Sequence, residues 1–143
     1  MSILDSITSE LKADSTVTNQ VSTRIYQDYA YAKAAKPYLV VYQISAVRFP
    51  HMVGASGVVN SRVQVDCVAS TRASRDATGD AVRLALDMAT GSIGKVAASN
   101  DQTIQYAQLN DDRHETVPPV QAGQRGIFTR SMDFLVWHAE TVP

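Results

Sequence analysis

Three histidines are the first side chains to test for metal chemistry, because imidazole nitrogens are common metal ligands. They are far apart in the sequence, at His51, His114 and His138. This arrangement lacks the spacing that places two ligands around one metal ion. We therefore expect no zinc site.

An acidic segment around His114 is the second candidate. Asp111, Asp112 and Glu115 could offer carboxylate oxygens to a divalent cation. They alternate with Arg113 in a segment that is typical of a solvated loop. We expect no bound cation there either.

Nucleophilic and phosphate chemistry have no local support. Cys67, the only cysteine, falls on the apolar side of a predicted strand, which indicates a buried, unreactive thiol without an intrachain disulfide. The glycines of residues 91–95 (GSIGK) lack the spacing of a phosphate-binding loop and end a helix instead. No nucleophile elbow occurs. We expect no catalytic residue and no cofactor.

Residues 58–70 (VVNSRVQVDCVAS) carry the clearest structural signal. Small or apolar residues alternate with polar ones, which predicts a half-buried strand with two different faces. The core-facing set is Val59, Val63, Val65, Cys67 and Ala69. The opposite set is Asn60, Arg62, Gln64, Asp66 and Ser70.

Helical spacing of apolar residues predicts one helix over about 3–11 and a second that begins after a Thr71 cap and continues to about residue 89. The expected buried stripe of the second helix is Ala73, Ala77, Ala81, Leu84 and Met88. The irregular stretch around Val17 and Val21 predicts at most one further turn.

Three more strands are predicted, at 38–47, 102–110 and 126–138. The last one places Phe128, Met132, Phe134 and Val136 on one face, opposite Thr129, Ser131 and Asp133. Residues 48–57 contain a proline and two glycines and are predicted as a loop. Residues 111–124 combine charges with two prolines and are predicted as a long surface arm.

These elements predict an α+β fold in one domain, 1–143: a single, mainly antiparallel sheet of about four strands with two helices packed on one face. The valine-rich side of residues 58–70 then faces the helices. The opposite, polar side of the sheet is either plain solvent-facing surface or a subunit contact.

Composition limits the function further. Hydrophobic residues are 45% and charged residues 19% of the chain, which is typical of a globular protein. A net charge of -1 without a run of Lys or Arg provides no field that attracts nucleic acid. The first residues carry acids and no long apolar run, so we expect a soluble, cytosolic protein without a signal peptide or membrane span.

Four segments together resemble a known family. They are residues 24–26 (RIY), 36–43 (KPYLVVYQ), 62–67 (RVQVDC) and 130–138 (RSMDFLVWH). In this order, over nearly the whole chain, they are similar to the small tail-completion or head-tail joining proteins of long-tailed bacteriophages. The chain departs from that pattern in the segments 49–57 and 111–124.

The resemblance implies a structural virion protein of the tail or neck, assembled in the host cytoplasm. It implies a ring of identical subunits, usually a hexamer, that caps the tail tube and meets the head-tail connector, with DNA only passing through the lumen. It implies no cofactor and no membrane. The alternatives are a head-closure ring, a tube-like protein, a small enzyme with a site near Cys67 or His51, and a nucleic-acid-binding module.

Candidate contacts with other subunits or partners lie in the predicted loop, on the polar strand face and in the predicted arm. They are Arg48, Phe49, His51, Met52, Arg62, Asp66, Asp111, Asp112, Arg113, His114 and Glu115.

Overall fold

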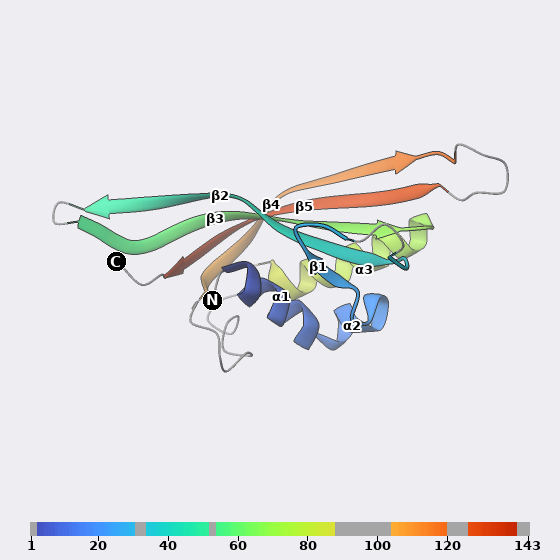
Figure 1. The fold of residues 1–143 in the computed structure, drawn as a ribbon, viewed down its shortest axis with the longest axis horizontal. Coiled ribbons are helices and arrows are strands. Elements are labelled where there is room, and N and C mark those ends of the chain that lie inside the picture. The colour runs from blue at the N-terminus through green and yellow to red at the C-terminus, as the bar shows by residue number, and fades with distance from the viewer. Residues whose placement is uncertain (1–2, 31–33, 52–53, 88–103, 120–125, 140–143) are drawn as a thin grey trace.

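The computed structural model describes residues 3–30, 34–51, 54–87, 104–119 and 126–139, with only the backbone course at residues 6, 49–51, 54–58, 104–106 and 139. Its elements in chain order are α1 (Ile3–Ala13), α2 (Ser15–Val21), β1 (Ile25–Gln27), β2 (Tyr38–His51), β3 (Gly54–Ala69), α3 (Arg72–Leu86), β4 (Ile104–Val117) and β5 (Ile127–Ala139). Figure 1 shows an elongated sheet with the helices gathered on one side.

The α+β class and the single sheet are confirmed, but the count of elements is corrected. The sheet has five strands in the order β1-β2-β3-β5-β4, and three helices accompany it. Its pairs are antiparallel except for β1, which pairs in parallel with β2. Only three residues long, β1 lacks the alternating apolar run by which a strand is recognised in sequence.

The alternating pattern of β3 forms the core as predicted. Val59, Val63, Val65, Cys67 and Ala69 all have 1% or less of their surface exposed. They face the helices, because successive strand residues point to opposite sides of the sheet. The core-facing side of β5 is equally regular, with Met132, Phe134 and Val136 buried beside them.

The stretch after α1 forms a full second helix instead of one irregular turn. The Asp14 side chain accepts hydrogen bonds from the backbone N–H groups of Thr16 at 2.9 Å and Val17 at 3.2 Å, which starts α2. Val17 and Val21 are then fully buried. Tertiary burial thus stabilises a seven-residue helix that would be marginal by itself.

The second predicted helix has the expected start but a different buried face. Thr71 caps α3 by accepting the Ser74 N–H at 3.2 Å. Of the predicted stripe only Ala81 is buried, whereas Leu84 is 81% exposed and Ala73 and Ala77 face solvent. The buried side instead consists of Arg75, Thr78, Gly79, Ala81, Val82 and Leu86. The helix ends at Leu86, and Met88 lies outside the described residues.

Residues 48–57 are not a loop. Where described, they belong to the long β2–β3 hairpin, with Pro50 paired to Ala55 and His51 to Gly54. The hairpin extends well beyond the helices (Figure 1). The prediction was wrong because proline and glycine also occur in strands at the edge of a sheet. In β2, Pro50 lies next to one of the two register shifts of this strand.

The predicted arm 111–124 is also wrong in its first half. Residues 111–117 continue β4, which pairs with β5 as far as the Val117–Ile127 pair. Charges are common on such an edge strand, because they remain solvated there and discourage pairing with other chains. Residues 111–117 were predicted as a loop because a loop and a solvated edge strand carry similar charged residues.

Candidate interaction surface

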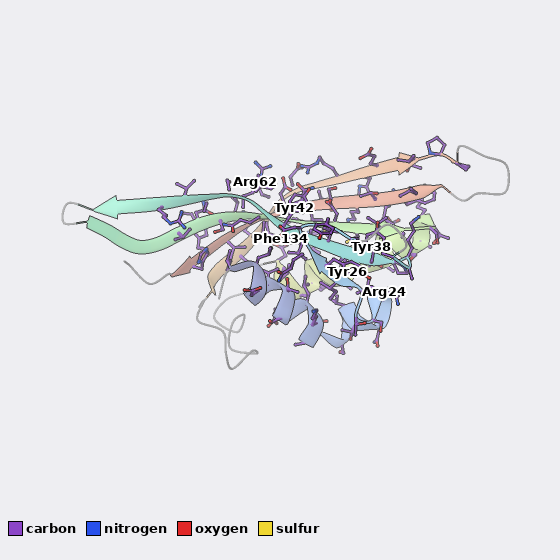
Figure 2. All side chains as sticks on the ribbon, viewed as in Figure 1. Arg24, Tyr26, Tyr38, Tyr42, Arg62 and Phe134 are labelled. Atoms are coloured by element: carbon purple, nitrogen blue, oxygen red, sulfur yellow. The ribbon has the colours of Figure 1, made fainter. Side chains whose placement is uncertain are left out.

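The side of the sheet away from the helices is called the open face below. Registers place Tyr42, Gln64, Asp133 and Asp111 in one row across β2, β3, β5 and β4, and Asp66, Ser131 and Arg113 in the next row. Figure 2 shows Arg62 projecting from this side. The open face therefore carries the polar set that the sequence assigned to β3.

Asp133 lies at the centre of an ion-pair network on the open face. Its carboxylate accepts a hydrogen bond from Arg62 at 2.5 Å and one from Arg113 at 3.2 Å. Arg113 also pairs with Asp111 and lies 3.4 Å from the Gln64 amide oxygen. The Asp133 side chain is 0% exposed, while the two arginines are 40% and 47% exposed. The arginines thus cover the carboxylate although none of the described helices packs on this side.

Two opposing effects act on the carboxyl of Asp133. Burial raises its pKa, but the hydrogen bonds from Arg62 and Arg113 outweigh burial and hold the pKa below its ordinary value. The carboxylate therefore stays ionised in the folded protein.

A second polar group on the open face links Tyr42 of β2 to Asp66 of β3 by a side-chain hydrogen bond, and Gln64 of β3 joins it. The Gln64 amide donates to Asp66 at 2.8 Å. Burial, followed by the charge of Asp66 and a hydrogen bond to it, raises the pKa of Tyr42 to about 12. Tyr42 therefore stays neutral and keeps its hydroxyl proton at physiological pH.

The opposite side of the sheet holds a clamp around Arg130 of β5. This side chain is 5% exposed and bonds Asp112 of β4 at 2.9 and 2.7 Å and Asp80 of α3 at 3.0 Å. It passes directly under Gly79, where an added Cβ would lie 2.5 Å from the Arg130 Cδ. Arg130 thus ties α3 to β5 and β4, and a Cβ added at position 79 would force the Arg130 side chain to shift.

The clamp also explains which face of α3 is buried. Helix rotation is set by Gly79 and Thr78, which sit over the sheet, and by Arg75, whose guanidinium lies 5.7 Å from the centre of the Phe128 ring. The alanines that suggested the predicted stripe then point outward.

Acidification should weaken the fold through these two ion-pair centres. Hydrogen bonds from Arg130 lower the pKa of Asp112 against the effect of burial, and the pKa of Asp133 is lowered as well. A carboxyl with a depressed folded-state pKa stabilises the fold above its unfolded pKa of about 4, and this stabilisation is lost as pH falls through the folded pKa.

We expect the free energy of unfolding, measured in urea across pH 2–7, to be level above about pH 5 and to fall below about pH 4. Asp112→Asn should reduce the stability at pH 7 and flatten the low-pH slope, whereas Asp28→Asn, at an exposed turn, should leave both unchanged. Equal stability at pH 3 and pH 7 contradicts the assignment.

Strand alternation separates residues that the sequence grouped as one arm. Asp111, Arg113 and Glu115 pair with Asp133, Ser131 and Thr129 and belong to the open face. Asp112 and His114 point to the helix side, where Asp112 joins the clamp and His114 Nε2 lies 4.0 Å from Asp76. That these five residues contact other subunits or partners remains a prediction.

The other predicted contact residues are scattered. Arg62 and Asp66 lie on the open face. Arg48 is exposed on β2, where it pairs with Val59 of β3 in the same hairpin. Met52 and the side chains of Phe49 and His51 lie outside the described residues.

Sequence reasoning did not single out Asp133 and Arg130 as the centres of the two clusters. It did place Asp133 on the polar side of the last strand, and the same alternation puts Arg130 on the side of Phe128 and Met132. An arginine within an otherwise apolar strand face is a signal that could have been used, because a buried guanidinium requires carboxylate partners.

No described cluster has the form of an active site or a metal site. Three or more metal-binding side chains do not gather anywhere in the described ranges. Ser61 Oγ and His138 Nε2 are 2.7 Å apart, but they are 0% and 3% exposed, so solvent and substrate cannot reach this pair. Burial raises the pKa of the Cys67 thiol, which keeps it protonated and unreactive. Among the described helices, none has the length and apolar content to cross a membrane.

In the described residues, the structure is thus a mixed sheet covered by helices on one side, with two charged clusters that join its strands. Residues 5–118 match the family described as Tail completion protein gp17, and the chain belongs to this family. The protein is thus a structural component of a phage virion, in its tail or neck.

Solved structures agree on the fold. A chain in the virion of a native gene transfer agent (GTA) particle has a TM-score of 0.61 to this protein at 20% sequence identity. The similarity covers 96% of this chain and 92% of that chain. In a sequence search, no curated protein matches the chain.

Proposed function

We propose that this protein closes the end of the phage tail tube as a ring, usually a hexamer, and joins the tail to the head connector. In this role it stops tube growth and performs no catalysis. The observation that carries the proposal is the family match over residues 5–118, because it covers most of the chain with a tail-completion family. DNA passes through the lumen of the ring without specific contacts.

The fold likeness supports a place in a virion. The similar chain is part of a gene transfer agent virion, and the likeness extends over 96% of this protein. A shared fold alone does not determine function. Combined with the family, it favours a protein that is built into a particle.

The charges of the open face are suited to a surface that DNA passes without binding. Its two central arginines, Arg62 and Arg113, are engaged by Asp133 and Asp111. Phosphate binding requires Lys or Arg side chains that can release counterions from DNA, and arginines already paired with carboxylates offer little such attraction. This balance favours passage over retention.

Solution mass measurement followed by electron microscopy with tail tubes tests the proposal. We expect a ring, assembled in solution or on the tube, that sits at tube ends. A ring that binds head connectors but ignores tubes supports the head-closure alternative. A monomer that ignores tubes and turns over a small substrate overturns the proposal.

A further inference from the structure

The outer edge of β2 is open over most of its length. β1 covers only Leu39 to Val41, and its last contact is the Asp28 N–H bond to the Val41 carbonyl at 2.9 Å. Asp28 has a φ of 66°, in the left-handed region, and it turns the chain away from the sheet. From Tyr42 to the end of β2, no other strand in the described chain lies outside it.

Along the second edge of the sheet, β4 pairs with β5 without interruption only from Asp111 to Val117, because a further register shift falls between Ile104 and Tyr106. The Leu109 N–H donates to the carboxylate of Asp87, the C-cap of α3, at 2.9 Å, and the Asp112 N–H donates to the neighbouring Asp111 carboxylate at 3.0 Å. A register shift between Leu109 and Asp111 disturbs the edge further. These features protect the middle of β4 from pairing and leave residues 113–117 as its regular open section.

Exposed apolar side chains coincide with the two open sections. Six large hydrophobic residues are exposed in the described chain, and four of them lie here. Ile44 (44% exposed) and Val47 (53%) belong to β2, while Val117 (42%) and its register partner Ile127 (36%) lie at the far end of the β4–β5 hairpin. Unpaired backbone and exposed apolar surface on the same strand section mark a contact surface.

The topology relates the two sections in a way that suits identical copies. β2 is antiparallel to β3, β3 to β5 and β5 to β4, so β2 and β4 run in opposite directions. They lie on opposite edges, and their open sections extend toward opposite ends of the sheet (Figure 1). Two copies side by side therefore present antiparallel strands to each other, which is the more stable form of pairing.

We propose that copies of this protein join edge to edge, with residues 42–47 of β2 paired antiparallel to residues 113–117 of β4 in the next copy. Such a contact is head-to-tail, and repetition closes a ring when the rotation permits. It covers both apolar pairs, whereas self-pairing of β2 would leave Val117 and Ile127 exposed. The offset between the sections is accommodated by strands that tilt, as in closed barrels. This inference specifies how subunits meet in the ring of the proposed function.

Complementary single variants test the head-to-tail contact. Val47→Asp blocks the β2 section and Val117→Asp blocks the β4 section, each by placing an unpaired carboxylate in the contact. Each variant alone should stay monomeric at concentrations where the unaltered protein assembles. Mixed in equal amounts, they should form a 1:1 heterodimer and nothing larger, because each retains one intact section. Leu84→Asp, at an exposed residue of α3, is the matched control and should assemble normally.

Analytical ultracentrifugation distinguishes monomers, dimers and rings by their mass. Homodimers of Val117→Asp point to β2 self-pairing and overturn the proposal, and so does assembly of Val47→Asp into rings. Unaltered protein that stays monomeric up to millimolar concentration also overturns it. Binding of tube ends is scored separately by microscopy, so a ring that seats on tubes but survives both substitutions leaves the proposed function standing and rejects only the edge contact.

Discussion

We expect Val65→Asp to abolish cooperative folding of this protein. Val65 is 0% exposed and lies between Val41 of β2 and Met132 of β5, both also fully buried. A carboxylate placed there without a partner costs several kcal/mol, which is comparable to the total stability of about 5–15 kcal/mol of a typical domain. Circular dichroism during thermal and urea unfolding should show no cooperative transition.

Val68→Asp is the matched control for this substitution. Val68 is on the same strand but on the open face, where it is half-buried beside Thr129. The same chemical change should cost no more than about 1 kcal/mol there. If both variants unfold with similar midpoints, β3 does not have one core face and one open face, and the architecture described above is wrong.

Gly79→Ala is the second change with a large expected effect, and its sign is opposite to helix propensity. In a helix interior, alanine is more favourable than glycine by about 1 kcal/mol. At this position the new Cβ would lie 2.5 Å from Arg130 Cδ, so Arg130 must move away from its carboxylate partners. Overpacking costs about 1–3 kcal/mol, of which helix propensity offsets about 1 kcal/mol, so we expect a net loss of up to about 2 kcal/mol in urea unfolding.

A double-mutant cycle isolates the clamp as the cause. In an Arg130→Ala background the space under α3 is empty, so Gly79→Ala should become stabilising by up to about 1 kcal/mol. Arg130→Ala alone should destabilise the protein, since it leaves Asp112 without its partner. A Gly79→Ala change that stabilises the unaltered protein contradicts the observed contact.

The sequence was most informative where one face of an element is buried against a continuous core. The alternation in β3 and β5 identified the core-facing residues correctly, because a half-buried strand must alternate. The Thr71 cap was also recognisable, because its hydrogen bond is local. An element with one buried face and local hydrogen bonds can therefore be predicted from the sequence.

Predictions failed where edge strands and long-range contacts decide the structure. Both open hairpin ends carry prolines, glycines or charges that also occur in loops, so residues 48–57 and 111–117 were assigned to loops. The buried side of α3 depends on Arg130, 51 positions after Gly79 in the chain, and no periodicity reports such a contact. β1 is recognisable only through its pairing with β2.

The sequence predicts which side of the sheet is polar, but it does not predict which charged residues form ion pairs there. Arg62 and Asp66 were assigned to the polar side of β3, which is the open face. The ion pairs of Asp133 with Arg62 and Arg113 join three strands, and they follow only from the strand order β3-β5-β4. A sheet order with β4 elsewhere would have left Asp133 without its second arginine.

Electron microscopy of tail tubes mixed with the purified protein tests the central claim most directly. We predict additional ring-shaped density at tube ends and none along the tube walls, with the Val65→Asp protein as a negative control. Tubes whose ends remain bare at saturating protein, or protein bound evenly along their length, would contradict the role of a ring that completes the tail.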